Sequence, residues 1–378
     1  MTPEQMRAYA DVVHDEEVAL LRTLAQIPAP TGHEEKRAAF VASWLRGAGA
    51  TDVEIDNENN VLCWLAQTPG AGVEVFSAHT DVVFDDTDPL PLREEDGRLY
   101  APGVGDDTAN LVGLLFAARY LLAHPQELEG RSVLVVANSC EEGLGNLRGT
   151  RALYDTLQAR IASHVAFDTT LGNYVSQAVG SHRWRISCTT EGGHSFKNYG
   201  RPNAISELAR LIVALEGIEL PSDPPCTRNV GTIEGGTTVN SIASHASMLY
   251  EHRSTSEDAL VQMREQLELV VSAHQREGVT FELELIGERP GNGSMDADAC
   301  ERLLLLEKRA ERTQRSATGC SEINHAPSST DVNIPLSRGI PGVCVGAVRG
   351  MGAHTRGEWI EIDSLQDGLV AVLGMMCA

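Results

Sequence analysis

The sequence predicts an α/β protein: a mixed sheet with helices on both faces, into which a smaller α+β unit is inserted. Two observations predict this arrangement. Apolar runs of strand length alternate with segments of helical period over residues 1–177 and again over 293–378, which is typical of an α/β layer. Over residues 178–292 the pattern changes to alternating strands with two helices, and about 115 residues are enough for a separate domain.

The first segment opens with helices. A helical pattern covers roughly residues 3–26 and ends at the run IPAP. Thr31 and Glu34 have the spacing of a capping box for a second helix over 33–49. Strands are then predicted at 53–56, 61–66 and 73–80, and a further helix at 108–124.

The clearest strand prediction is the run RSVLVVANS, residues 131–139. Its apolar residues are continuous and bounded by polar ones, so we expect a central strand that is buried on both faces. A helix at 148–158 and a strand at 162–170 follow.

The remaining segments complete the two predicted domains. In the insertion, strands are expected at 181–191, 229–236, 247–254 and 279–288, with helices at 203–218 and 256–278. After it, a helix at 298–314, a strand at 340–347 and a last helix at 364–376 return to the α/β layer.

Charge and composition exclude several classes of protein. Lys and Arg total 30 and Asp and Glu total 53, and the formal charge of −23 argues against nucleic acids and anionic membranes as partners. No apolar stretch reaches the length of a membrane span, and the polar start does not resemble a secretory signal. Cys140, Cys188 and Cys344 stand in apolar or strand-like runs, so we expect free, buried thiols and a cytoplasmic location.

Acidic and imidazole side chains follow three of the predicted strands. His79 and Asp81 close one strand, Glu141 and Glu142 follow the central strand, and Asp168 closes a third. In open α/β sheets, ligands gather at the carboxyl ends of the strands, so these five side chains are expected to meet. Each motif alone is a weak signal, because such residues more often cap helices or face solvent.

A glycine-rich turn, PGVGDD at 102–107, adds Asp106 and Asp107 just before the helix near Thr108. This set of residues suits a pair of metal ions about 3.5–4 Å apart, held by imidazoles and carboxylates with one carboxylate bridging. A metal-bridging hydroxide would be the nucleophile, and a carboxylate that does not bind metal would pass its proton to the leaving amine.

The order of the motifs resembles that of a known family. The runs that carry the resemblance are FSAHTDVV, GVGDDTAN, NSCEEGLG, AFDTT, EGGHSF, EGGTTVNSIA, HRS, SSTDVN, GIPGVCVGA and AHTRGEWI, over residues 76–360. They are similar to the co-catalytic dizinc peptidases and deacylases, which include aminoacylase, glutamate carboxypeptidase and peptidase T, and most similar to the peptidase T-like branch. The resemblance implies a mixed-sheet zinc-exopeptidase catalytic domain, residues 1–177 and 293–378. It also implies a ferredoxin-like lid or dimerisation domain, residues 178–292.

The resemblance implies five metal ligands. His79 and Asp168 would bind one ion, Glu142 and His354 would bind the other, and Asp106 would bridge them. Zinc suits imidazole and carboxylate ligands, and cobalt or manganese would also fit.

The resemblance also implies roles for residues that do not bind metal. Asp81 would orient the metal-binding imidazole, and Glu141 would be the general base and then the general acid. In the inserted domain, His194 would stabilise the oxyanion, and Asn240 and Arg253 would bind substrate, the latter through a carboxylate. An ordinary ion pair is the alternative for Arg253.

The expected reaction is therefore hydrolysis of an amide bond in a short peptide, in the manner of an aminopeptidase or tripeptidase. In the family, aspartate at the position of Asp168 tends to accompany peptidase activity and glutamate deacylase activity. An N-acyl amino acid deacylase or a carboxypeptidase with the same metal site is the alternative. An inactive binding relative is a further one, which the complete ligand set disfavours. The expected partners are a small peptide substrate and a second copy of the chain, bound through the inserted domain.

Overall fold

The structure, a computed structural model, describes residues 1–377 and divides into two units. Unit 1 consists of Met1–Ala178 and Ser294–Ala378, and unit 2 is Val179–Gly293. The predicted domain boundaries each lie one residue before these divisions. Each unit has a hydrophobic core of its own.

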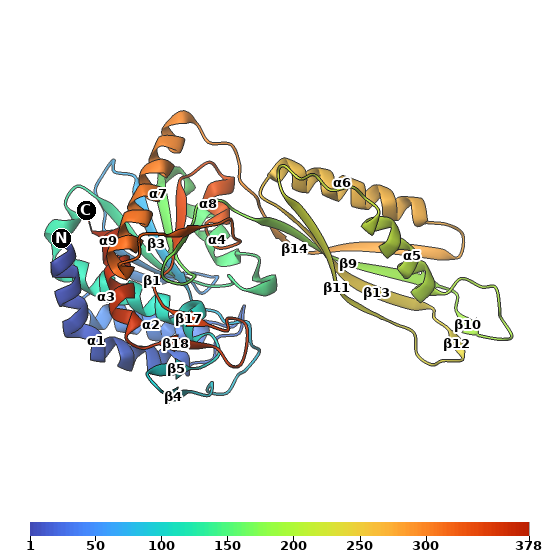
Figure 1. The fold of residues 1–378 in the computed structure, drawn as a ribbon, viewed down its shortest axis with the longest axis horizontal. Coiled ribbons are helices and arrows are strands. Elements are labelled where there is room, and N and C mark those ends of the chain that lie inside the picture. The colour runs from blue at the N-terminus through green and yellow to red at the C-terminus, as the bar shows by residue number, and fades with distance from the viewer. Residues whose placement is uncertain (378) are drawn as a thin grey trace. The chain divides into compact units, whose positions relative to one another are not determined.

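Unit 1 is built around an eight-stranded mixed sheet (Figure 1). In spatial order its strands are β1 (Val53–Ile55), β2 (Val61–Ala66), β6 (Ser132–Asn138), β3 (Val73–His79), β7 (Ile161–Phe167), β16 (Gly342–Val345), β8 (Asn173–Val175) and β15 (Asn324–His325). The four neighbours β6, β3, β7 and β16 are parallel, whereas β2 and β8 run antiparallel to the strands beside them in this central group. The predicted fold class is confirmed.

Helices cover both faces of this sheet. They are α1 (Pro3–Ala25), α2 (Glu35–Gly47), α3 (Asn110–Ala123), α4 (Arg148–Leu157), α7 (Ala297–Thr318), α8 (Asn333–Ser337) and α9 (Ser364–Met376). Val133 and Val135 of β6 belong to a core with α1, α3 and α9, whereas Leu134 and Val136 of the same strand join Tyr154 of α4 in another. Because successive residues of a strand point to opposite faces, β6 is buried along its whole length, as its apolar run predicts.

A second, four-stranded sheet in unit 1 was not predicted. It has the order β17 (Gly350–Met351), β18 (Trp359–Glu361), β5 (Arg98–Tyr100) and β4 (Arg93–Glu95). Its strands are only two or three residues long, so they are too short to show an alternation of apolar and polar residues in the sequence. The loop between β17 and β18 carries His354 and Glu358.

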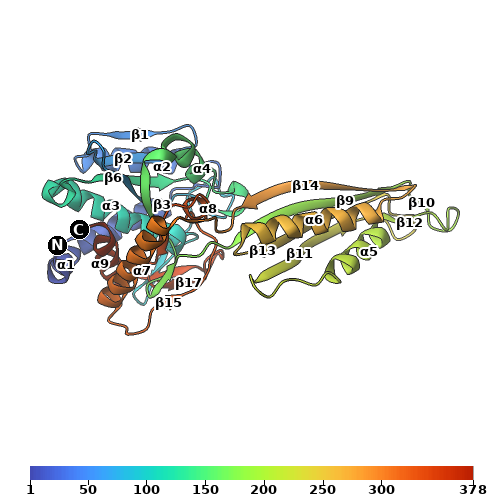
Figure 2. The ribbon, with the colours of Figure 1, turned by 90° about the horizontal axis from the view of Figure 1, so that it is seen from above.

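Unit 2 has a β-α-β-β-α-β order. Its elements are β9 (Gly180–Thr190), α5 (Ala204–Glu216), β11 (Cys226–Gly235), β13 (His245–Ser254), α6 (Glu257–His274) and β14 (Val279–Arg289), with a small pair formed by β10 (Gly193–His194) and β12 (Ser241–Ile242). The sheet order β11-β13-β9-β14, with α5 and α6 on one face (Figure 2), is the ferredoxin-like arrangement.

The prediction that Thr31 and Glu34 form a capping box for the second helix is wrong, because both side chains bind to the loops at the strand ends. The second helix begins at Glu35, and Glu34 makes no side-chain capping bond to it. Instead, Oε1 of Glu34 accepts hydrogen bonds from the backbone N–H groups of Gly32 (2.7 Å) and Cys140 (3.2 Å). Thr31 donates to Asp81 at 2.9 Å. Both side chains stabilise the loops at the strand ends rather than the helix.

Two simpler expectations can be compared with the structure. Among the described residues, no helix is both long and apolar enough to cross a bilayer. All eight cysteines are free thiols, and Cys140, Cys188 and Cys344 are buried, as predicted.

Candidate dimetal centre

The candidate site lies where three neighbouring parallel strands end. His79 is the last residue of β3, and it pairs in register with Asn138, the last residue of β6. Glu141 and Glu142 follow β6 within a short loop, and Asp168 directly follows β7 on the other side of β3. The sheet order β6-β3-β7 therefore brings the five strand-end side chains to one edge.

Asp106 lies between two groups of possible metal ligands. Its Oδ1 is 3.1 Å from Nε2 of His79, and its Oδ2 is 3.1 Å from Nε2 of His354. Ligand atoms of His79, Asp106 and Asp168 all lie within 4.8 Å of one another, as do those of Asp106, Glu142 and His354. One carboxylate thus belongs to both groups, with a different oxygen facing each imidazole.

The protonation of His79 fits a metal ligand. Its Nδ1 lies 3.1 Å from the backbone carbonyl oxygen of Asp81, which can only accept, so Nδ1 donates. In the neutral ring Nε2 then carries a lone pair, which faces a carboxylate oxygen of Asp106. Such a pair of acceptors requires a proton or a metal ion between them. His354 Nε2, close to Asp106 and 3.2 Å from Oε1 of Glu142, has a similar carboxylate environment.

The electrostatics of the cluster favour a cation. Hydrogen bonds to Asp106 and Glu142 raise the pKa of His354 to about 10. Burial would lower the pKa of His79, but Asp107, Asp106 and Asp81 raise it well above its ordinary value. Burial raises the pKa of Glu142 to about 6. A divalent ion would replace the protons that these groups otherwise hold, because metal ligands bind in their deprotonated forms.

Asp81 connects three of the candidate site residues. It is fully buried. Its Oδ1 accepts a hydrogen bond from the backbone N–H of Glu141 at 3.0 Å, and its Oδ2 accepts one from that of Glu142 at 2.9 Å. Its own backbone carbonyl fixes His79, and its carboxylate lies 3.4 Å from Nδ1 of that ring. One side chain therefore orients both strand ends.

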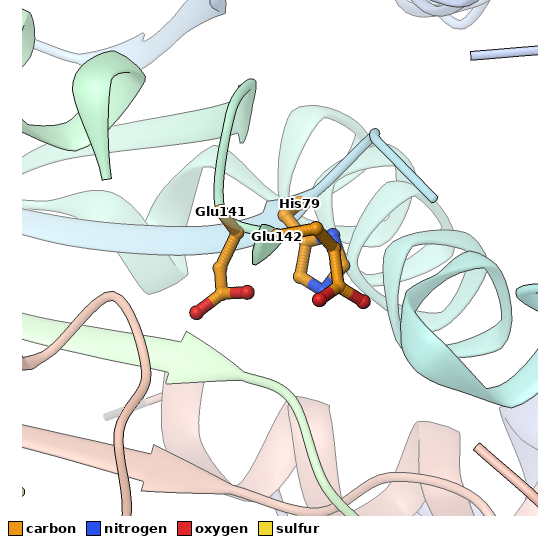
Figure 3. Close-up of side chains that lie close together, drawn as sticks. All are labelled: His79, Glu141 and Glu142. Atoms are coloured by element: carbon orange, nitrogen blue, oxygen red, sulfur yellow. The ribbon is translucent and has the colours of Figure 1, made fainter. Parts of the chain in front are cut away.

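The two adjacent glutamates point in different directions (Figure 3). The carboxylate of Glu142 lies beside the His79 ring and that of Glu141 is directed to another side, although one oxygen of Glu141 still lies within 4.8 Å of ligand atoms of His79 and Glu142. Both side chains are almost fully buried. One can therefore bind a metal while its neighbour remains available for proton transfer.

Two further acids, Glu358 and Asp107, were not assigned a role from the sequence, and both fix the backbone of a candidate ligand residue. Glu358 accepts hydrogen bonds from the backbone N–H groups of Gly103, Gly105 and Asp106 at 2.7–2.8 Å, and burial raises its pKa to about 7. Asp107 accepts from the backbone N–H of His79 at 2.8 Å. Glu358 stands in the AHTRGEWI run. Its burial against the glycine-rich turn could not be predicted, because no periodic pattern of apolar residues marks the position.

Asp331 provides a further buried support. Its carboxylate accepts hydrogen bonds from Asn138 at 2.6 Å and from Thr150 at 2.5 Å, and burial raises its pKa to about 6. It thereby ties the end of β6 to α4. His325, by contrast, stacks on Tyr174 and contacts Ser176 rather than a metal ligand.

The predicted oxyanion residue, His194, and the two predicted substrate-binding residues, Asn240 and Arg253, belong to unit 2. His194 is exposed, and its Nδ1 accepts a hydrogen bond from the backbone N–H of Phe196 at 3.2 Å. Asn240 is also exposed. Its backbone carbonyl oxygen accepts a hydrogen bond from the backbone N–H of Ser195, the residue after His194, so the two residues are neighbours. Arg253 forms an ion pair with Glu251 at 3.0 Å.

His194 and Arg253 lie at opposite ends of the unit 2 sheet. Arg253 pairs with Ser181 at the start of β9, whereas β10, which carries His194, follows Thr190 at its end. Nine residues of strand span about 30 Å. A short peptide that touches one of these two side chains therefore cannot touch the other within the same chain.

Two ligand groups that share one carboxylate, at the carboxyl edge of a parallel sheet, define the metal-dependent hydrolases as the class of this protein. Residues 75–377 match the family described as Peptidase family M20/M25/M40. This match covers most of the chain, so the chain belongs to that family and is a hydrolase of the metallopeptidase type.

Individual relatives extend the comparison. Succinyl-diaminopimelate desuccinylase of Corynebacterium glutamicum is 26% identical over 360 residues, which cover 93% of each chain. The enzyme of the same name from Bordetella parapertussis is 28% identical over 291 residues, 71% of this chain and 75% of that one. The crystal structure of aminopeptidase PepT from Bacillus cereus matches with a TM-score of 0.73 at 21% identity, over 96% of this chain and 98% of that one. The similarity to the PepT structure shows that the two chains have the same fold.

Proposed function

We propose that this enzyme hydrolyses an amide bond in short peptides that have a free amino end. The reaction would use two divalent metal ions, for which zinc is the first choice. The observation that carries the proposal is the position of Asp106, one oxygen of which lies 3.1 Å from His79 and the other 3.1 Å from His354. His79 and Asp168 would hold one ion with Asp106, and Glu142 and His354 the other.

The residues of the chain divide the work of the reaction. When bound, two divalent ions polarise the amide carbonyl and make water acidic enough to attack it near neutral pH. Glu141 takes the proton of that water and delivers it to the nitrogen of the leaving amine. Asp81 holds the backbone of Glu141 and the ring of His79, so it keeps the base and one ligand in a fixed relation.

The residues of unit 2 would recognise the substrate. His194 would donate to the developing oxyanion, with Asn240 beside it, and Arg253 would bind a substrate carboxylate in place of Glu251. Since His194 and Arg253 are separated by about the length of β9, a second copy of the chain would have to supply one of the two. A homodimer through unit 2 is therefore part of the proposal.

A deacylase is the second candidate. It is favoured by the two sequence relatives, which are named as desuccinylases. Asp168 favours the peptidase, because aspartate at this position accompanies peptidase activity in the family that the sequence resembles. Both reactions would use the same metals and the same base.

The test is release of amine from a matched set of substrates, with and without a chelator. The set contains a free tripeptide, a free dipeptide, the same tripeptide N-acetylated, and an N-succinyl amino acid. Chelator-sensitive cleavage of the free peptides alone is expected, because a free amine near an anionic site is favoured over a blocked one.

Cleavage of the N-succinyl amino acid instead would replace the peptidase by the deacylase. Activity that survives complete removal of divalent ions would contradict both candidates.

A further inference from the structure

A second histidine–carboxylate cluster lies wholly within unit 2. His182 is on β9, Glu288 on β14, and Glu257 is the first residue of α6. One ligand atom of each lies within 4.8 Å of the others. We propose that these three residues bind a divalent transition-metal ion, with zinc as the reference ion, and that this ion ties β9, β14 and α6 together.

The strand register builds this cluster on the core face of the sheet. His182 pairs directly with His252 of β13 on one side and with Glu288 of β14 on the other. Directly opposite residues point to the same face, and His182 has the parity of Trp184, whose side chain lies in the core. His252, His182 and Glu288 thus form a row of polar side chains across this face, close to Glu257, the first residue of α6.

Nε2 of His182 is buried and makes no hydrogen bond among the described residues. The side chain is 1% exposed, and its other ring nitrogen, Nδ1, lies 3.0 Å from Nε2 of His252. If Nδ1 donates in that contact, the neutral ring has its lone pair on Nε2. A buried lone pair next to carboxylates is unfavourable unless a cation joins them.

An ordinary cross-strand ion pair is the competing explanation. Nε2 lies 3.3 Å from Oε1 of Glu288, yet the direction between them does not make a hydrogen bond. That separation suits two ligands of one ion, because ligands about 2.1 Å from a tetrahedral centre are about 3.4 Å apart. His252 would then steady the ligand ring through Nδ1, as partners of metal-bound histidines do.

Glu257 completes the ligand set and connects it to the chain beyond β14. Its Oε2 accepts a hydrogen bond from the backbone N–H of Gly291 at 2.9 Å. Two carboxylates and a neutral imidazole supply oxygen and nitrogen donors of the kind that a divalent transition-metal ion accepts. His182 and Glu288 stand three and five residues from Val179 and Gly293, the ends of unit 2. The ion would stiffen the part of unit 2 where the chain enters and leaves it.

Anomalous X-ray scattering at the zinc edge tests the inference on the whole protein, equilibrated with a buffer that keeps free zinc at trace level. We expect a peak about 2.0–2.2 Å from Nε2 of His182. Glu288→Gln should abolish it. Glu284→Gln should keep it, since Glu284 is an exposed acid of the same strand and its loss changes the charge equally.

The two proposals fail separately. Peaks at His79 and His354 without one at His182 would overturn this inference and leave the proposed function standing. A peak at His182 without peaks at His79 and His354 would support this inference and contradict the proposed function. Persistence of the His182 peak in Glu288→Gln and in His182→Gln would show that these side chains do not bind the ion, and would also overturn the inference.

Discussion

Asp81 illustrates how one residue can hold several parts of the candidate site in place. Its carboxylate accepts the backbone N–H groups of Glu141 and Glu142, and its carbonyl fixes the tautomer of His79. In Asp81→Asn one carboxylate oxygen is replaced by an NH₂ group that faces an N–H donor. We expect metal affinity or kcat to fall by roughly 10–100-fold, as for other residues that orient metal ligands.

The measurement is metal content and kcat for Asp81→Asn beside Thr31→Val. The latter removes only the hydrogen bond from the Thr31 hydroxyl to Asp81 (2.9 Å) and leaves the two backbone N–H bonds to the carboxylate in place, so it should have a much smaller effect. Wild-type values in Asp81→Asn would show that the orientation of the ligands does not depend on this carboxylate.

The adjacent glutamates give a second prediction. Glu141→Gln should keep both metals and lose turnover by several orders of magnitude, because the proton has no other acceptor of the same kind. Glu142→Gln should lose metal. Metal analysis and kcat of the two variants, with exposed Glu129→Gln as the control, make the comparison. Equal metal loss in both would contradict Glu141 as the base.

His164 gives a prediction about pH and stability. It is fully buried between Ser77 and Tyr154, and burial lowers its pKa to about 3. Below the ordinary histidine value of about 6.5, the unfolded chain binds a proton that the folded chain does not. The free energy of unfolding therefore falls as the pH falls from about 6.5 toward 3, and the contribution is constant above that window.

Denaturant unfolding of wild type and His164→Gln between pH 8 and about pH 5 measures this effect. The variant should lose less stability over this range, although it is less stable at pH 8. Exposed His33→Gln should follow wild type. Parallel curves for wild type and His164→Gln would contradict the prediction.

At the scale of single residues, the sequence is most informative about the candidate site residues at the strand ends and least about the residues that support them. His79, Glu141, Glu142 and Asp168 could be located because strand ends are visible in the apolar pattern. The role of Glu34 could not, because its local spacing indicates a helix cap, whereas in the fold it accepts an N–H from Cys140, over a hundred residues away. Local rules are expected to fail where tertiary contacts at a site compete with them.

At the scale of elements, the close contact between α9 and the segment that follows β16 explains a glycine inside a helix. A Cβ on Gly368 would lie 1.7 Å from the backbone oxygen of Ala347. Alanine normally stabilises a helix by about 1 kcal/mol relative to glycine. Here overpacking should dominate, and we expect Gly368→Ala to lose roughly 1–3 kcal/mol or more.

Gly113 in α3 is the matched control. A Cβ there would meet only Val372 Cγ2, at 3.4 Å, so Gly113→Ala should be neutral or slightly stabilising. Denaturant midpoints of the two variants provide the measurement. Equal midpoints would show that α9 can move away from Ala347 at little cost.

The predictability of elements follows their length and burial. The run of β6 is long and apolar, so its position could be predicted, and α5 begins after Asn203 as its pattern indicates. The strands β4, β5, β17 and β18 are too short for any period to appear. α3 begins at Asn110, two residues later than expected, because an irregular helical turn over Val104–Ala109 precedes it.

At the scale of the whole molecule, the separation of His194 and Arg253 gives a prediction about assembly. If a second chain supplies His194, the inactive variants His194→Ala and Glu141→Ala should complement each other when they are mixed under conditions that exchange subunits. Statistical pairing would restore about a quarter of wild-type activity, since half of the dimers are mixed and each has one complete site.

No recovery after verified exchange would assign His194 to the site of its own chain or to no site. As the control, a mixture of Glu141→Ala with Glu142→Ala should stay inactive, because both residues are expected to act within one chain.

The architecture of the whole chain could be predicted because the change of pattern near residues 178 and 293 is strong. What the sequence could not indicate is the separation between residues within unit 2. Arg253 and His194 are expected to act on one substrate, and only the register of β9 with β13 shows how far apart they lie.

Unit 2 is joined to the rest of the chain through two neighbouring strands. Ser181 of β9 stands opposite Arg289 of β14, so the Cα atoms of these two residues, which lie close to the ends of the insertion, are about 5 Å apart. Such a segment can be removed or expressed as a unit. A linker of a few residues could close the gap left by its removal, and residues 179–293, with their own core, could be produced as a separate polypeptide.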